Sequence, residues 1–332
     1  MMKKFAILFL CFGFLTANAT SWRVNSNTAI DADFSDLAAA IAAAANGDTL
    51  YVEGSLFDYG SVTVDKTLVL IGPGYFLDQN DSTQVNFNPA ELENLTISQN
   101  AVACEIYGLY ITGYVKISAN DIIFARNHHQ PNYSGDILKL AYTNATSNCV
   151  ITQNYLLGIH GYNYEALNMI ITNNYVADEL VLDSDCSGTI FNNVVLTKIS
   201  AHNSVVKNNI TYDHNNGGYS GNNSVFEYNI ANYQFGTMPP GPGNISGIDP
   251  ADVFVDFDGT LGYSEDAKWQ LKEGSIAIGY GENGVDCGCF GGTSPYVLSG
   301  LPAIPHIYEA IVPTSGSAAS GLPVTIKVKS QN

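Results

Sequence analysis

A short motif centred on asparagine recurs through the middle of the chain. It reads apolar, any, any, Asn, apolar, and successive copies are 16 to 27 residues apart. Each copy holds a short β-branched run, which favours a strand over a helical turn. The repeat is too short for a propeller blade of roughly 40 residues and lacks the hairpins of a sandwich. Its asparagines are Asn127, Asn154, Asn174, Asn193, Asn209 and Asn229.

These repeats predict a parallel β-solenoid, in which each repeat is one coil and the strands of neighbouring coils pair. We expect about eight or nine coils between Asp48 and Tyr233. The asparagine would lie at a bend, where it tolerates unusual backbone angles, and its amide would hydrogen-bond to the asparagine of the next coil. The apolar residues on both sides of the bend would then point into the coil.

The composition agrees with a solenoid built from strands and turns. The 332 residues include 33 Asn and 31 Gly but only 13% charged residues. Asn and Gly favour turns over helix interiors, and 46% hydrophobic residues are enough to build a core. The formal net charge of −18 argues against binding to nucleic acid or to an anionic membrane surface.

The N-terminus has the layout of an export signal. Two lysines precede an apolar run over residues 5–15, and residues 17–19 read Ala-Asn-Ala, a cleavage pattern. The run is shorter than the roughly 20 residues of a membrane-spanning helix, and Leu10 before Cys11 disagrees with a lipoprotein signal. We therefore predict a signal peptide over residues 1–19. The protein would be secreted, periplasmic or at the cell surface, neither lipidated nor membrane-spanning.

Both ends of the repeat region have recognisable patterns. Upstream, residues 34–47 read as a short amphipathic helix with a glycine stop, followed by Asp48 and a strand. The apolar side of this helix would cover the open end of the first coil. Downstream, residues 249–292 contain D-P…F-x-D, then W-Q-L-K-E-G-S-I-A-I, then D-C-G-C-F. The apolar residues of the helix are Leu37, Ile41, Ala44 and Ala45.

With these segments the chain resembles the right-handed parallel β-helix proteins of the pectate-lyase-like superfamily, in their secreted bacterial form. The family opens with a helix, Gly-Asp, a strand and L-x-L-x-G, which residues 34–52 and 68–72 match. It closes with L-x-x-G-S-P-A-I and D-I-G-A-F, where this chain has Ile276 for the proline and Cys287 and Cys289 for the isoleucine and alanine. The resemblance implies a fold and no particular reaction, because such coils occur on lyases, hydrolases and adhesins.

We therefore predict an all-β, right-handed parallel β-helix with an N-terminal capping helix and an extended C-terminal tail. After the signal peptide, the cap would span residues 20–47 and the β-helix with its closing segment residues 48–292. A tail rich in Pro, Ser and Gly would follow over residues 293–332 and end in a strand. Five cysteines beyond the signal peptide show no disulfide spacing and are expected in the core.

A site on such a rod has to lie outside, because side chains fill the interior. In the enzymes of this superfamily the reacting groups lie on the outer face of the first sheet and its loops. If the asparagine separates the second and third sheets, the first-sheet strands would cover residues 114–118, 136–140, 165–167, 179–183 and 198–200. Alternation then places an outward row along this sheet: Lys116, Lys139, Glu179, Asp183 and Lys198.

This row suggests a site for an acidic sugar. Lys116, Lys139, Asp183 and Lys198 are the candidate catalytic residues, with Lys139 neutralising a uronate or acting as a base. Asp183 and Asp185 could hold Ca²⁺ through their carboxylate oxygens. The alternative is an ordinary solvated face without a ligand.

Tyrosines should lie beside the same row. The loops at residues 130–135, 158–164 and 213–223 would emerge between the third and first sheets, next to the lysines. A rigid ring with a polar tip suits the face of a sugar, although chance alignment is easy in a chain with 20 Tyr. The candidate ligand-binding residues are Tyr133, Tyr162, Tyr164 and Tyr219.

We expect a secreted β-helix that binds a polysaccharide or cell-surface glycan, without assigned catalysis. Two alternatives stay open: a divergent Ca²⁺-dependent lyase of uronate-containing glycans, and an envelope protein attached through its tail. The Gly-His-Gly, Asn-Thr-Asp and Arg-Ile-Lys motifs of β-helix polygalacturonases are missing, as are G-x-S-x-G, H-E-x-x-H and a P-loop. His128 and His129 could supply a base but, following a bend, are expected to form a structural pair.

Overall fold

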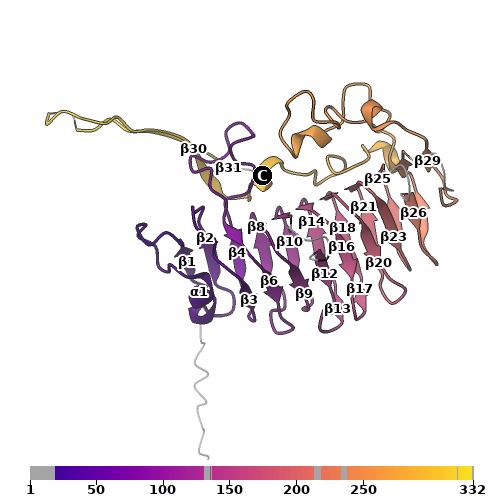
Figure 1. Cartoon of the computed structure of the whole chain (residues 1–332), viewed down its shortest axis with the longest axis horizontal. Coiled ribbons are helices and arrows are strands. Elements are labelled where there is room, and N and C mark those ends of the chain that lie inside the picture. The colour runs from indigo at the N-terminus through magenta and orange to yellow at the C-terminus, as the bar shows by residue number, and fades with distance from the viewer. Residues whose placement is uncertain are drawn as a thin grey trace, which may run out of the picture.

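The computed structural model describes residues 19–130, 135, 137–212, 218–232, 238–319 and 321–330, so the predicted signal peptide lies almost wholly outside the described residues. Most of the chain forms a rod in which short strands stack side by side (Figure 1). Three sheets of ten, nine and eight strands run along the rod, and each strand pairs in parallel with the strand of the next coil. The chain is therefore a right-handed parallel β-helix, as the repeats predicted.

The three sheets follow one another around each coil in the order A, C, B. Sheet A contains β1 (Ser21–Val24), β2 (Thr49–Val52), β4 (Val69–Ile71), β7 (Glu105–Tyr107), β10 (Ile123–Ala125), β14 (Val150–Thr152), β18 (Met169–Thr172), β21 (Gly188–Phe191), β24 (Val205–Lys207) and β27 (Val225–Glu227). Sheet C contains β5 (Glu91–Leu92), β8 (Tyr110–Ile111), β11 (His128–His129), β15 (Tyr155–Leu156), β19 (Tyr175–Val176), β22 (Val194–Val195), β25 (Ile210–Thr211), β28 (Ile230–Ala231) and β29 (Ile245–Ser246). Sheet B contains β3 (Val62–Val64), β6 (Leu95–Ile97), β9 (Val115–Ile117), β12 (Leu138–Leu140), β16 (Ile159–Gly161), β20 (Leu180–Leu182), β23 (Lys198–Ala201) and β26 (Gly218–Ser220).

The repeated asparagines form a buried ladder between sheets A and C. In Asn174, Oδ1 accepts hydrogen bonds from the backbone N–H and Nδ2 of Asn154, at 3.0 and 2.9 Å. Its Nδ2 donates to the carbonyl of Ile151 at 2.8 Å. The same pattern links all six predicted asparagines and continues to Asn244. Each amide thus pairs backbone groups that the bend would otherwise leave unsatisfied inside the protein.

Two details of the predicted bend are wrong. The left-handed backbone conformation lies one residue before each ladder asparagine, for example at Gln153 (φ 56°) and Asn173 (φ 55°). The ladder residue itself keeps an ordinary conformation, which aims its amide along the rod. Because the next residue begins a strand of sheet C, its side chain points away from the coil interior. Tyr155 and Tyr175 therefore pack in a second apolar cluster outside the coil.

The closing segment builds that second cluster by running back along sheet C (Figure 1). Trp269 stacks on Tyr175 with ring centroids 4.7 Å apart, and the hydroxyls of Tyr75 and Tyr296 are 2.7 Å apart. The segment therefore covers the outer face of one sheet over much of its length. Its short 3₁₀ helices are η1 (Pro250–Asp252), η2 (Ala267–Trp269) and η3 (Glu282–Gly284). The first residues of the predicted tail extend this cover with Tyr296 and η4 (Leu298–Gly300), so the part that leaves the rod begins only after Leu301.

A short helix, α1 (Leu37–Ala43), lies near the first coil, close to the predicted position. Asp36 caps it by accepting a hydrogen bond from the N–H of Ala39. Leu37, Ala40 and Ile41 are buried, whereas Ala45, predicted on the apolar side, is exposed. In the described part of the chain, no helix is long and apolar enough to cross a membrane.

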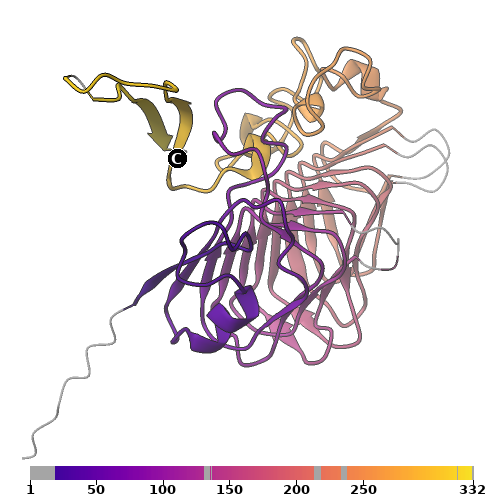
Figure 2. The ribbon, with the colours of Figure 1, turned by 60° about the vertical axis from the view of Figure 1, so that its left-hand side comes forward.

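The tail leaves the rod as an antiparallel ribbon of β30 (Pro305–Ile311) and β31 (Thr325–Ser330). Figure 2 shows this ribbon standing away from the coil beside its first turns. The predicted terminal strand is therefore present, and it pairs with the start of the tail. A further small parallel sheet joins β13 (Thr146–Ser147) and β17 (Ala166–Leu167).

The five cysteines of the described chain are free and buried, as predicted. Burial raises the pKa of the Cys104 and Cys149 thiols to about 11. Such thiols stay protonated near neutral pH and act as small apolar core residues.

Candidate functional site

Two lysines lie next to each other on the outer face of sheet B. Lys116 on β9 is in direct register with Lys139 on β12. The residues on either side of each lysine point inward and are fully buried, which sends both ammonium groups outward as the alternation predicted. The sheet therefore places two cations on neighbouring coils, where like charges repel.

Tyrosine rings surround these two ammonium groups. The Nζ atom of Lys116 is 3.6 Å from the ring centroid of Tyr114 and 4.3 Å from that of Tyr142. The Nζ atom of Lys139 is 5.1 Å from the centroid of Tyr162. Tyr142 and Tyr162 stack on each other at 5.5 Å. Each cation–π contact contributes about 0.5–1 kcal/mol at an exposed site, which offsets part of the repulsion between the lysines.

Neither lysine has a carboxylate partner among the described residues. Most other cations of the described chain do have one: Lys198 pairs with Glu179, Lys207 with Glu227 and Glu282, and Arg23, Lys268, Lys272 and Lys327 have one each. Lys66 and Arg126 donate instead to carbonyl or amide oxygens. Lys329, on the tail ribbon, also lacks a carboxylate partner among the described residues and lies over the ring of Tyr308. Within the described coil, Lys116 and Lys139 are therefore the unusual cations in a chain with a net charge of −18.

Beyond the two lysines the predicted row does not stay in register. Val181 and Ser200 take the positions in line with Lys139. Glu179 and Lys198 lie two residues earlier on their strands, where they form a compact ionic cluster beside the lysines. His160 on β16 is in register with Lys139. The Glu179 carboxylate lies 2.8 Å from His160 Nε2, poorly aligned for a hydrogen bond, and 2.8 Å from Lys198 Nζ. Partial burial raises the pKa of Glu179, but the hydrogen bond and charge of Lys198, with the charge of His160, outweigh this and lower the pKa overall. Glu179 is thus a fixed negative charge that engages Lys198.

His160 was not predicted from the sequence, because the strand of this coil was expected at other residues. Residues 165–167 were expected on the first sheet, but Ile159–Gly161 takes that place as β16. Ala166 and Leu167 pair instead with β13 at a corner of the coil. Only two residues separate β15 from β16, so the sheet C to sheet B turn is much tighter here than expected. Tyr114 was also missed, although it lies two residues before Lys116 and alternation places it on the same face.

The predicted ligand-binding tyrosines differ in where they lie and in what they contact. Tyr162 and Tyr164 follow β16, so they lie at the opposite edge of sheet B from the one expected, and Tyr162 nevertheless reaches Lys139. Tyr164 is 52% exposed and contacts neither lysine. Tyr219 is wrong as a ligand residue, because it lies on β26, points inward and donates its hydroxyl to the carbonyl of Asn209. Tyr133 lies outside the described residues.

The predicted calcium site is not supported by the side chains. Asp183 and Asp185 are exposed and follow β20. Among the described residues, no group of three or more His, Cys, Asp or Glu side chains converges. Ca²⁺ takes six to eight oxygen ligands, so a site at these two carboxylates would need backbone carbonyls and water as well, and it stays a prediction.

The histidine pair lies in the structural part of the molecule. His128 stacks on Tyr110, with ring centroids 4.6 Å apart, and is 4% exposed. Burial lowers its pKa to about 3, so the ring is neutral at ordinary pH. His129 is fully buried, and its Nε2 lies 2.7 Å from the carbonyl of Gly113. Both histidines lie on sheet C, whereas the two lysines lie on sheet B.

These features define the class of protein. It is a right-handed parallel β-helix that carries a row of lysines and tyrosines on the outer face of sheet B. Among solved structures, the chain is similar to the crystal structure of pectate lyase Pel9A, with 13% sequence identity and a TM-score of 0.38 over 82% of this chain and 96% of that one. This likeness carries no information about ligand or reaction. No protein-family model matches the sequence, and no curated protein matches it.

Proposed function

We propose that the outer face of sheet B binds an acidic polysaccharide. Lys116 and Lys139 would contact the carboxylates of uronate sugars, while Tyr142 and Tyr162 would contact the sugar rings. The observation that carries this proposal is the pair of lysines in register, held among tyrosine rings and without a carboxylate partner in the described chain.

A simple solvated face explains this arrangement less well. Two like charges on neighbouring strands lower the stability of a sheet, and this chain has an excess of carboxylates to pair with them. An anionic ligand would remove the repulsion by lying between or above the two ammonium groups. A glycan outside the cytoplasm also agrees with the export signal predicted over residues 1–19.

The test is binding of the full chain to polygalacturonate, compared with the same polymer fully methyl-esterified. We expect binding to the acidic form alone. Lys116→Ala and Lys139→Ala should each weaken it by about tenfold or more, since each removes a charge-assisted hydrogen bond. Lys272→Ala is the matched control, because it removes the same charge from a lysine of the closing segment that is paired with Asp252. Equal loss in all three variants would point to overall charge and contradict the proposal.

Binding and cleavage are separated in the same incubations. A polysaccharide lyase leaves an unsaturated sugar that absorbs in the ultraviolet, so absorbance is followed over time with Ca²⁺ and with chelator. We expect no increase. An increase that Lys139→Ala abolishes would replace the binding proposal with the lyase alternative.

A further inference from the structure

Asp48 is a buried carboxylate at the start of the first coil. It lies between α1 and β2, and the residue is only 3% exposed. Its Oδ2 accepts hydrogen bonds from the indole Nε1 of Trp22 and from the N–H of Ala45, both at 2.9 Å. Its Oδ1 accepts one from the N–H of Thr20 at 2.7 Å. The hydrogen bonds from Trp22, Thr20 and Ala45 lower the pKa of Asp48, so the carboxylate is charged near neutral pH.

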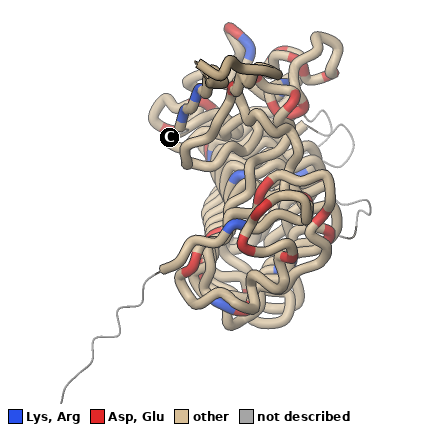
Figure 3. Tube along the Cα trace, turned by 90° about the vertical axis from the view of Figure 1, so that its left-hand side faces the viewer, with Lys and Arg blue, Asp and Glu red and all other residues tan. Residues whose placement is uncertain are grey.

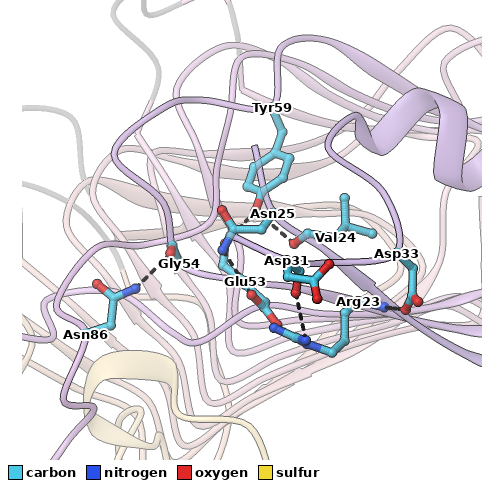
Figure 4. Close-up of polar contacts among 9 residues, drawn as sticks. All are labelled: Arg23, Val24, Asn25, Asp31, Asp33, Glu53, Gly54, Tyr59 and Asn86. Atoms are coloured by element: carbon cyan, nitrogen blue, oxygen red, sulfur yellow. Dashed lines mark hydrogen bonds and ion pairs between the residues drawn. The ribbon is translucent and has the colours of Figure 1, made fainter. Parts of the chain in front are cut away.

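No cation forms an ion pair with this carboxylate in the part of the chain that the structure describes. The charge of Lys66 also lowers the pKa of Asp48, but its ammonium group donates to the last carbonyls of α1. Figure 3 shows Asp and Glu spread over the loops at this end of the coil. Arg23, on β1, is engaged with Glu53, as Figure 4 shows. Asp48 therefore lacks the counter-charge that offsets the cost of burying a carboxylate.

The cleavage predicted for the export signal falls at a residue that contacts Asp48. The Ala-Asn-Ala pattern ends at Ala19, so a signal peptidase would hydrolyse the bond between Ala19 and Thr20. Water adds across this bond, so that Ala19 leaves as a carboxylate and the nitrogen of Thr20 becomes an ammonium group. An α-amino group is protonated below about pH 7.7–8.0. The nitrogen that already donates to Asp48 would then carry a positive charge.

Thr20 is held in place by contacts that do not involve the residues before it. Its carbonyl accepts a hydrogen bond from the N–H of Thr49 at 2.9 Å, and the pairing of β1 with β2 begins at the next residue. Trp22 packs edge-on against Phe34, with ring centroids 5.5 Å apart. A chain terminus stays ordered when it is tied down in this way. The nitrogen of Thr20 should therefore stay beside Asp48 after cleavage.

We propose that removal of residues 1–19 creates an ion pair between the α-ammonium group of Thr20 and the carboxylate of Asp48. The pair fastens β1 to the turn between α1 and β2, which closes the first coil. In the uncleaved chain the same nitrogen is a neutral amide, so Asp48 has no counter-charge and the first coil is less stable. Processing thus stabilises the fold at export, while the precursor is easier to unfold. The ion pair is independent of the glycan face, so either proposal can fail alone.

The experiment uses protein that cells export with its own signal peptide. Mass spectrometry should find Thr20 as the first residue. A second form has a glycine inserted between Ala19 and Thr20, so that the same cleavage moves the ammonium group one residue away and leaves an amide at Thr20. The unfolding midpoint of this glycine form should be about 2–4 °C lower at pH 6.5. Asp48→Asn should remove the difference between the two forms, because it removes the charge.

The dependence on pH separates charge from chain length. An ion pair raises the pKa of the α-amino group above the value of about 7.7–8.0 in the unfolded chain. The additional stability of the form that begins at Thr20 is then fully present below about pH 7.7 and is lost as pH rises through the raised pKa. The two midpoints should therefore converge at alkaline pH. Lys66, Arg23 and Glu53 are identical in both forms, so their titration does not contribute to the difference.

Asp33→Asn is the matched control, because Asp33 accepts a hydrogen bond from the N–H of Arg23 on the same strand. It removes a carboxylate near β1 but should keep the difference between the two forms. Equal midpoints at pH 6.5, or a difference that persists in a folded Asp48→Asn variant, would overturn the proposal. So would a first residue other than Thr20 in the exported protein. If Asp48→Asn does not fold, the pH series decides, because a difference that stays constant into alkaline pH excludes the ammonium group as its cause.

Discussion

Single asparagine side chains hold the coils of this protein in register. Each of the six predicted ladder amides is fully buried at the same corner of its coil, and its donor and acceptor both bond to neighbouring coils. The residue before it adopts the left-handed conformation, often as a second asparagine such as Asn173 or Asn192. Asn tolerates this conformation better than most residues, so the Asn-Asn pairs of the repeat have two separate physical causes.

Replacing one ladder residue, in Asn174→Ala, should lower the free energy of unfolding by about 2–4 kcal/mol. The change leaves the buried carbonyl of Ile151 and the N–H of Asn154 unpaired. Urea unfolding measures the loss. Asn100→Ala, at an exposed turn, serves as the control and should change stability by less than about 0.5 kcal/mol. An equally small effect at Asn174 would show that the ladder does not hold the coils.

His128 should make the protein sensitive to acid. Burial lowers its pKa to about 3, while the unfolded chain protonates histidine near pH 6.5. The unfolded state thus binds the additional proton between these values, and stability falls as pH falls, by up to about 1.4 kcal/mol per pH unit. His128→Phe should make this slope shallower in unfolding experiments from pH 6.5 to 4. Tyr155→Phe, in the same cluster, should leave the slope unchanged. Identical slopes in the unaltered protein and in both variants would show that His128 does not cause the acid sensitivity.

Among the elements, the closing segment determines which face of the rod is available. It covers sheet C with an aromatic cluster in which Trp269, 3% exposed, packs on Tyr175 and against Phe254. Sheet B has no such cover in the described chain, and its outward side chains include the lysine row. The available face is therefore fixed by where a segment distant in sequence packs.

Trp269→Ala should destabilise the protein by about 3–5 kcal/mol, because it empties the centre of the aromatic cluster. Trp269→Phe should cost clearly less, and Leu261→Ala, at a residue 70% exposed in the same segment, should be neutral. Chemical unfolding measures stability, and limited proteolysis reports release of the segment. A neutral Trp269→Ala would mean that the segment does not depend on this contact.

For the whole molecule, the tail is the part least tied to the rod. Beyond Leu301 it forms the β30–β31 ribbon, where Ile311, Ile326 and Val328 are more than half exposed. Such exposed apolar residues agree with the alternative that the tail attaches the protein to a surface. The acidic coil and the tail would then have separate roles, one in glycan binding and one in attachment.

Truncation before Ala303 should leave the unfolding midpoint of the coil within about 2–4 °C of the full chain, because the ribbon adds little to the core. If the tail is the attachment segment, the truncated protein should no longer stay with the cell surface. Fractionation of cells that express both forms measures this. Surface association of the truncated form would remove the attachment role, and a large drop in midpoint would show that the ribbon is structural.

The repeat, the asparagine ladder and the inward positions such as Ile151 and Ile171 could be read from the sequence, because they depend on local periodicity that every coil repeats. The outward placement of Lys116 and Lys139 followed from the same alternation. The sequence did not reveal that β16 replaces residues 165–167, because turn length varies from coil to coil without a local signal. The stacking of Trp269 on Tyr175 and the contact between Tyr75 and Tyr296 join segments more than 90 residues apart in the chain. Those contacts form only when the closing segment and tail fold back along the finished rod, so the tertiary structure alone decides them.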